Sequence, residues 1–175
     1  MNTKITFKLA AAAMLIALAG CAGHHPHGGP DSLTAEQVQN WNEAAAKYKA
    51  CNQAWREHLV ASAPQFNQLA NSLNDPQYLQ KMSSRAPVEK GFKEALIKYR
   101  PEQMACRKVL FDTLGNQNPA VSAMYTQNFR TLDSVIVGVL DGKLKTMGEV
   151  NQAYVNFNNE VSDRKTRLTA RSSRN

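Results

Sequence analysis

The sequence predicts an all-α fold, an antiparallel helical bundle of about four long helices. Apolar residues recur every three or four positions over four long stretches, which is the period of one helix face. No stretch alternates apolar and polar residues with the period of two that a half-buried strand shows. An antiparallel bundle buries four such faces together. We therefore expect one helical domain over residues 33–170, with a short helical excursion at 63–86.

The first helix is expected to begin after Thr34. Thr34 and Gln37 have the spacing of a capping box, in which each side chain accepts the backbone N–H of the other residue. An apolar face then follows at spacings of three and four: Trp41, Ala44, Tyr48, Cys51, Trp55 and His58. Pro64 breaks the pattern, so the helix should end at about Ala61.

Prolines shape the excursion and the second long helix. Asp75 and Pro76 have the residue types of an N-cap and a first helical position. The next apolar face consists of Phe92, Leu96, Tyr99, Cys106 and Leu110. Pro101 lies inside this helix, where its missing N–H and its ring predict a kink or a break. Gly115 is expected as the helix stop.

Two further helices complete the predicted bundle. Pro119 should open the third helix, and Asp141-Gly142 should close it. Its apolar positions are Val121, Tyr125, Leu132, Ile136 and Val139. Thr146 and Glu149 have the spacing of a second capping box. The apolar positions of the last helix are Val150, Tyr154, Phe157, Val161 and Leu168.

The first twenty residues have the layout of a secretion signal. Lys4 and Lys8 precede an uninterrupted apolar run over residues 9–18. As a helix this run would cover only about half of a hydrocarbon core of about 30 Å, so we expect a cleaved signal peptide over residues 1–20. Leu18–Cys21, Leu-Ala-Gly-Cys, then resembles the lipobox of bacterial lipoproteins.

The lipobox resemblance implies a lipid anchor on Cys21. In that family a diacylglycerol donor alkylates the thiol, a peptidase cleaves before the cysteine, and the new terminus is acylated. Ala22, where an Asp would favour the inner membrane, implies the outer membrane with the domain facing the periplasm. The implied partners are the membrane, held through Cys21, and a cell-envelope protein or peptidoglycan. An ordinary signal peptide with an incidental cysteine is the alternative.

His24, His25 and His27 stand in a Gly- and Pro-rich linker over residues 21–32. Neutral imidazoles bind Cu²⁺, Ni²⁺ and Zn²⁺, so these three residues are the candidate metal ligands. A plain spacer between anchor and domain is the alternative interpretation, and we expect no resident cofactor.

Residues 33–37, Leu-Thr-Ala-Glu-Gln, resemble the LTxxQ motif of a periplasmic stress-chaperone and metal-resistance family. Members of that family are small and all-helical, and a His/Gly-rich stretch can precede the motif, as residues 24–29 do here. The resemblance, which covers residues 24–37, implies a metal-binding or chaperone-like protein. This is the alternative to a binding or scaffolding domain.

Cys51 and Cys106 remain once Cys21 is assigned to the lipid. An even pair of cysteines in an exported chain predicts a disulfide. Both residues fall on apolar faces, so the bond would join the first long helix to the kinked one.

Charge excludes one class of partner. Without residues 1–20 the chain has 19 Lys and Arg against 14 Asp and Glu, a formal charge of +5. This suits anionic lipid headgroups or cell-wall carboxylates. A nucleic-acid binder would carry a denser basic stripe with interleaved aromatics, so we expect no nucleic acid. The basic residues between 163 and 174 end in a polar tail, 171–175, and a solvated helix end explains them at least as well as a binding surface.

His58 is the single histidine of the predicted domain, and it falls on the apolar side of the first helix. It is either a satisfied core or boundary residue or, given partners, a catalytic base. The sequence holds no GxSxG, HExxH or P-loop motif, so we assign no catalytic residue. The chain is expected to be a membrane-anchored protein that binds or scaffolds without catalysis.

Overall fold

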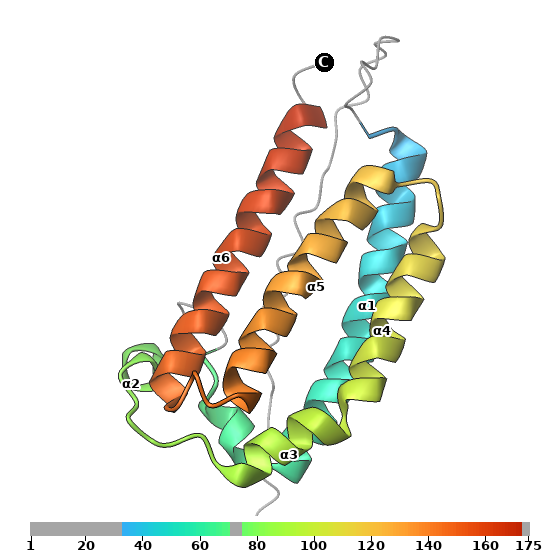
Figure 1. Ribbon diagram of the computed structural model, residues 1–175. Coiled ribbons are helices and arrows are strands. Elements are labelled where there is room, and N and C mark those ends of the chain that lie inside the picture. The colour runs from blue at the N-terminus through green and yellow to red at the C-terminus, as the bar shows by residue number, and fades with distance from the viewer. Residues whose placement is uncertain (1–32, 71–74, 173–175) are drawn as a thin grey trace, which may run out of the picture.

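An antiparallel helical bundle forms over residues 33–70 and 75–172, the part of the chain that the computed structural model describes (Figure 1). Its elements are α1 (Ala35–Ser62), the 3-10 helix η1 (Pro64–Gln68), α2 (Tyr78–Met82), α3 (Lys90–Lys98), α4 (Arg100–Leu114), α5 (Pro119–Leu140) and α6 (Met147–Ser172). The chain runs down α1, up α3 and α4, down α5 and up α6 (Figure 1). The predicted all-α bundle is therefore confirmed. The expectations for Cys21 and the linker histidines lie outside the described residues.

Both predicted capping boxes are present. The Thr34 hydroxyl accepts the Gln37 N–H at 3.2 Å, and the Gln37 side chain accepts the Thr34 N–H at 2.9 Å. At the start of α6, the Glu149 carboxylate accepts the Thr146 N–H at 2.9 Å, and the Thr146 hydroxyl accepts the Glu149 N–H at 3.3 Å. Hydrogen bonds from the Thr146 and Lys145 backbone N–H groups lower the pKa of Glu149. Local sequence alone thus determines where α1 and α6 begin.

The second long helix is broken rather than kinked. α3 ends at Lys98, Tyr99 separates it from α4, and Pro101 lies in the first turn of α4. Proline fits there because the first N–H groups of a helix have no partner within the helix. The predicted effect of Pro101 is confirmed as a break, which lets α3 pack across the ends of α1 and α5 (Figure 1).

One predicted helix start is wrong. α2 begins at Tyr78 rather than at Pro76. The Asp75 carboxylate accepts the Gln77 N–H at 2.9 Å and the Lys81 ammonium at 2.8 Å. It therefore closes a local turn and an ion pair instead of capping a helix.

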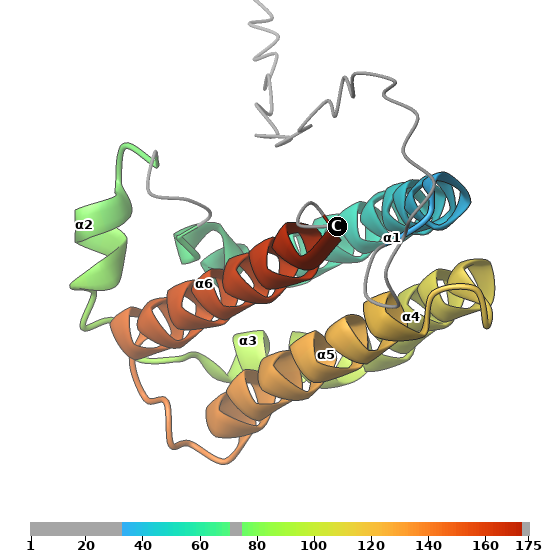
Figure 2. The ribbon, with the colours of Figure 1, turned by 90° about the horizontal axis from the view of Figure 1, so that it is seen from above.

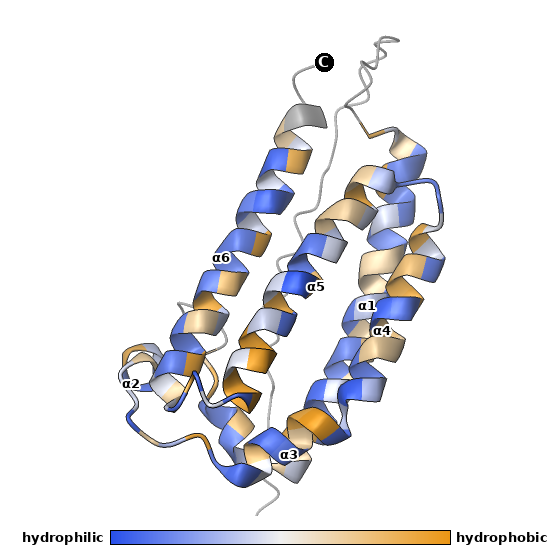
Figure 3. Cartoon of the chain, in the orientation of Figure 1, coloured by the Kyte–Doolittle hydropathy of each residue, from blue (hydrophilic) through white to orange (hydrophobic). Residues whose placement is uncertain are grey.

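Two hydrophobic cores follow one another along the bundle. The α3-end core consists of Leu59, Ala63, Phe66, Phe92, Ala95, Leu96, Ile136, Val139, Met147 and Val150. The terminal-end core consists of Trp41, Ala44, Leu110, Leu114, Val121 and Phe129, and it lies where α1 begins and α6 ends. Figure 3 shows strongly apolar positions in α3 and in the adjoining half of α5. Every residue of both cores comes from the described helices and their connections.

Two fully buried asparagines join distant parts of the chain. Asn118 donates to the Gln37 carbonyl at 2.8 Å and to the Asn40 side chain at 2.7 Å, which fixes the start of α5 to α1. Asn151 accepts the Ala70 N–H at 2.8 Å and donates to the Lys81 carbonyl at 2.9 Å. Asn151 thereby fixes η1 and α2 to α6, and its side-chain oxygen satisfies the buried Ala70 N–H.

The long helices pack in two close pairs, α1 with α4 and α5 with α6. Contacts between the pairs are fewer, and α1 and α6 make little direct backbone contact. Figure 2 shows α2 projecting beyond the start of α6, away from the four long helices. The arrangement leaves a seam between α1 and the α5–α6 pair.

Candidate functional site

An apolar cavity of about 250 Å³ lies in this seam, beside the α3-end core. Side chains of α1 between residues 48 and 60 form one wall, and side chains of α5 between 132 and 139 form the opposite one. α6 contributes residues between 150 and 157. The cavity therefore lies where α1, α5 and α6 contribute to one core while α1 and α6 make little direct contact.

Aromatic rings form the wall of the cavity at the α3 end. Phe66 of η1 stacks on Phe92 of α3, with ring centroids 4.0 Å apart and planes 17° apart. Both residues line the cavity, and both are buried. The break at Tyr99 is what brings α3 and Phe92 to this position.

Polar groups line the cavity on one stripe of α1. Tyr48, Asn52 and Arg56 are spaced four residues apart and so lie on one side of the helix. Burial raises the pKa of Tyr48 to about 12, although the nearby Arg107 charge acts in the opposite direction. Tyr48 is therefore a neutral phenol at pH 7, and Arg56 is the one formal charge among the described lining residues.

Trp55 also lines the cavity, and its indole N–H is a buried donor. Among the described residues, no acceptor lies within hydrogen-bond distance of Trp55 Nε1. An unsatisfied buried donor is uncommon in proteins and costs about 1–3 kcal/mol.

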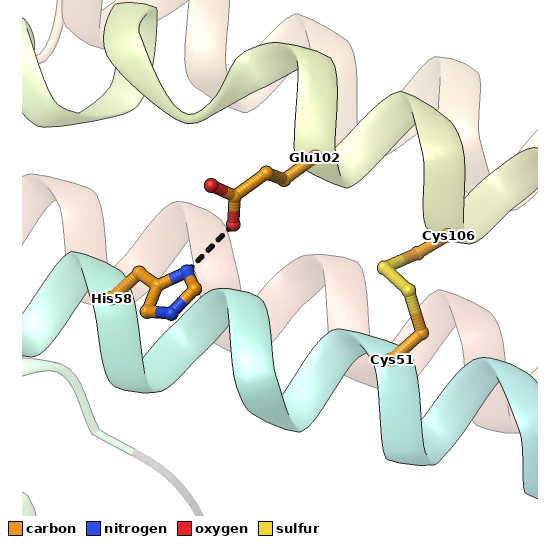
Figure 4. The surroundings of a disulfide bond; sticks show 4 residues. All are labelled: Cys51, His58, Glu102 and Cys106. Carbon is orange, nitrogen blue, oxygen red and sulfur yellow. Dashed lines mark hydrogen bonds and ion pairs between the residues drawn. A yellow bond between two sulfur atoms is a disulfide. The ribbon is translucent and has the colours of Figure 1, made fainter.

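The disulfide predicted between Cys51 and Cys106 is present, with Cα atoms 5.4 Å apart (Figure 4). It joins α1 to α4, and Cys106 is buried. The bond lies one turn from Tyr48 and one turn from Trp55 along α1, so it fixes the α1 wall of the cavity to α4.

His58 belongs to neither core, so the core alternative for this residue is excluded. Its side chain is 56% exposed and Leu59, the next residue, takes the buried position. His58 Nδ1 lies 2.7 Å from the Glu102 carboxylate of α4 (Figure 4). Glu102 can face His58 because the break at Tyr99 places it in the first turn of α4. This exposed pair is not part of the cavity lining.

A partly buried ionic cluster between α4 and α5, with Arg107 as its buried member, was not predicted from the sequence. Arg107 is 6% exposed and donates to the Asp133 carboxylate at 2.8 Å, and Arg100 donates to the same group at 2.8 Å. Burial raises the pKa of Asp133, but the hydrogen bonds and charges of the two arginines outweigh it and lower the pKa below its usual value. The available signal was the spacing of two arginines seven residues apart on one helix side.

Among the described residues, no three His, Cys, Asp or Glu side chains are grouped closely enough to hold a metal ion. The candidate ligands His24, His25 and His27 lie outside this part of the chain. In the same part, no helix combines the length and the apolar composition that crossing a membrane requires. The chain matches no protein-family model, no curated protein and no solved structure.

Proposed function

We propose that the chain is a lipid-anchored bacterial envelope protein whose helical domain binds an apolar ligand without catalysis. The observation that carries the proposal is the cavity of about 250 Å³. Ligand sites in proteins are typically concave and mostly apolar, with a few polar groups that orient the ligand. Asn52, Arg56 and Tyr48 are such groups here.

Two further observations support this function. The signal-like run and the Leu-Ala-Gly-Cys sequence ending at Cys21 resemble those of lipoproteins. The Cys51–Cys106 disulfide fits an oxidising compartment such as the periplasm. An outer-membrane location facing the periplasm belongs to the same proposal. Labelling with radioactive palmitate tests the anchor, and Cys21→Ser should abolish it.

Binding is tested with 1-naphthylamine, a dye of ten carbons that is neutral at pH 7 and whose fluorescence reports apolar surroundings. The protein used begins at residue 22, and it retains both cores without the acyl groups. We expect saturable binding of one dye per chain. Val135→Phe, on the α5 wall of the cavity, should weaken binding at least tenfold because the ring occupies the ligand's space.

Val137→Phe is the matched control, because Val137 is on the same helix, is 49% exposed and does not line the cavity. It should leave dye binding unchanged. Equal effects of the two substitutions would refute the cavity as the binding site. Circular dichroism of both variants excludes unfolding as the cause.

A chaperone-like function of the LTxxQ kind is the second candidate, because a concave apolar surface is also what such a protein offers a client. Suppression of aggregation of a reduced client protein tests it. The suppression of aggregation by wild type is compared with that by Val135→Phe. Suppression that Val135→Phe abolishes would favour this candidate over storage or transport of a small ligand.

A further inference from the structure

We infer that the cavity binds one single-chain alkyl carboxylate, with about ten carbons of the chain inside and the carboxylate at Arg56. This inference rests on the proposed binding function and names its ligand class. It follows from the volume of the cavity, its shape and the charges around it.

The volume excludes a helical partner segment. A single helical turn, with a pitch of 5.4 Å and a diameter of at least about 10 Å, occupies roughly 400 Å³, well above the 250 Å³ available. A cavity of 150 Å³ holds benzene, so by proportion 250 Å³ holds roughly ten carbon atoms. The occupant is therefore a small molecule.

The shape favours a chain over a compact ring system. The lining residues of α6, from Val150 to Phe157, span about 10 Å at 1.5 Å per residue. Those of α1, from Tyr48 to Val60, span about 18 Å on the same scale. A lining that extends this far along the bundle around so small a volume favours an elongated ligand, such as an extended alkyl chain.

The charged residues of the cavity lining indicate the sign of the ligand's headgroup and the position where it binds. The described lining residues include Arg56 and no carboxylate. Arg56 is exposed, and Asn52 precedes it by one turn, so a guanidinium and an amide lie together at the solvent edge of the α1 wall. Guanidinium groups bind carboxylates through two paired hydrogen bonds between opposite charges, whereas a hydroxyl headgroup offers a single acceptor and no opposite charge.

The test is titration calorimetry of the chain from residue 22 onward with hexanoate, octanoate, decanoate and dodecanoate. Affinity should rise about fourfold for each added methylene up to about ten carbons and then level off, because further methylenes remain in water. Trp55 emission provides a second readout in the Trp41→Phe variant, since Trp55 lines the cavity and Trp41 belongs to the terminal-end core.

Arg56→Gln separates the headgroup from the chain. It should weaken decanoate binding about tenfold and leave decanol binding unchanged. Arg130→Gln is the matched control, because Arg130 is an exposed arginine of α5 outside the lining. An equal loss for decanoate and decanol, or no loss for either, would overturn the assignment of the carboxylate.

Failure of this inference is distinguishable from failure of the proposed function. If 1-naphthylamine or naphthalene binds and no alkyl compound displaces it, the alkyl ligand is refuted while the cavity remains a binding site. If neither the aromatic probes nor the alkyl compounds bind, both proposals are refuted.

Discussion

The two cores of the bundle differ in what fills them. In the terminal-end core, rings gather around Phe129: the rings of Tyr48, Phe111 and Tyr125 lie 5.6, 5.8 and 6.1 Å from it. The Arg107 guanidinium lies 4.5 Å from the same ring. The α3-end core is mostly aliphatic and has one stacked aromatic pair, Phe66 with Phe92.

The difference shows how one bundle provides both rigidity and a site. Large rings around a single hub leave α1, α4 and α5 few alternative ways to pack. Branched aliphatic side chains of α1, α3, α5 and α6 meet at the other end, and the cavity lies beside them. The predictions below test whether the two ends respond differently, from the largest expected effect to the smallest.

Removal of the disulfide should have the largest effect, because the bond joins α4 to α1, the helix that contributes to both cores. Replacing Cys51 and Cys106 by Ala should lower the free energy of unfolding by about 4 kcal/mol, the chain-entropy value for a loop with a sequence separation of 55. Urea denaturation measures it, and wild type in reductant should show the same loss. A loss below about 1 kcal/mol would mean that packing alone holds the two helices.

Asp133→Asn should lower the free energy of unfolding at pH 7 by about 3 kcal/mol, because Arg107 would keep a buried charge without its carboxylate. The folded-state pKa of Asp133 is lowered, so its contribution is complete above the unfolded-state value of about 4 and is lost as the pH falls through the folded-state pKa. The difference between wild type and variant should therefore narrow below about pH 4. Denaturation curves between pH 7 and pH 2 measure this.

Asp112→Asn is the control for Asp133→Asn. Asp112 forms an exposed ion pair with Lys108 within α4. Its loss should change the free energy of unfolding by at most about 0.5 kcal/mol. A comparable loss from both variants would show that burial of Arg107 contributes nothing.

Gly148→Ala tests the α3 end. A Cβ at Gly148 would lie 2.6 Å from the Ser84 carbonyl oxygen and 2.8 Å from that of Met82, and backbone atoms yield little. We expect a loss of about 2 kcal/mol in the free energy of unfolding. Gly91→Ala in α3, where nothing lies within 4 Å, should instead stabilise the protein by up to about 1 kcal/mol. Thermal unfolding measures both changes in stability. A change of the same sign in both variants would contradict the close approach of Gly148 to the two carbonyl oxygens.

Thr34→Ala tests the terminal end and should have the smallest effect, about 1 kcal/mol, because the Gln37 N–H loses its acceptor. Thr34→Ser keeps the acceptor and should be nearly neutral. Hydrogen exchange of the first turn of α1 is the measurement. Equal protection in both variants would mean that packing of the terminal-end core, rather than the cap, fixes the start of α1.

Local signals in the sequence were sufficient for the caps and the break. The capping pair Thr34–Gln37 and the break at Pro101 depend only on neighbours within four residues. Both could therefore be predicted without knowledge of the fold. The disulfide was also predictable, because the expected export of the chain and the expected lipid on Cys21 leave Cys51 one partner. The exposed position of His58 could not be predicted, because the apolar repeat of α1 does not show that α4 begins nearby and presents Glu102 to His58.

The cavity could not be predicted for a different reason. Its lining comes from η1, the residue after it and four helices, and it depends on α1 and α6 staying apart, which no local pattern encodes. The buried pair of Arg107 and Asp133 is similar, since each looks like an ordinary solvated residue until α4 and α5 are in place.

α1 begins at the end of the bundle where α6 finishes (Figure 1). With Cys21 as the anchor, a linker of 12 residues ties this end to within about 40 Å of the bilayer. Asn52, at the edge of the cavity, lies about 26 Å further along α1. Under the proposed anchor, the tether would therefore join the domain at the terminal-end core, away from the edge of the cavity, and a carboxylate ligand would reach the exposed Arg56 from water without passing through lipid.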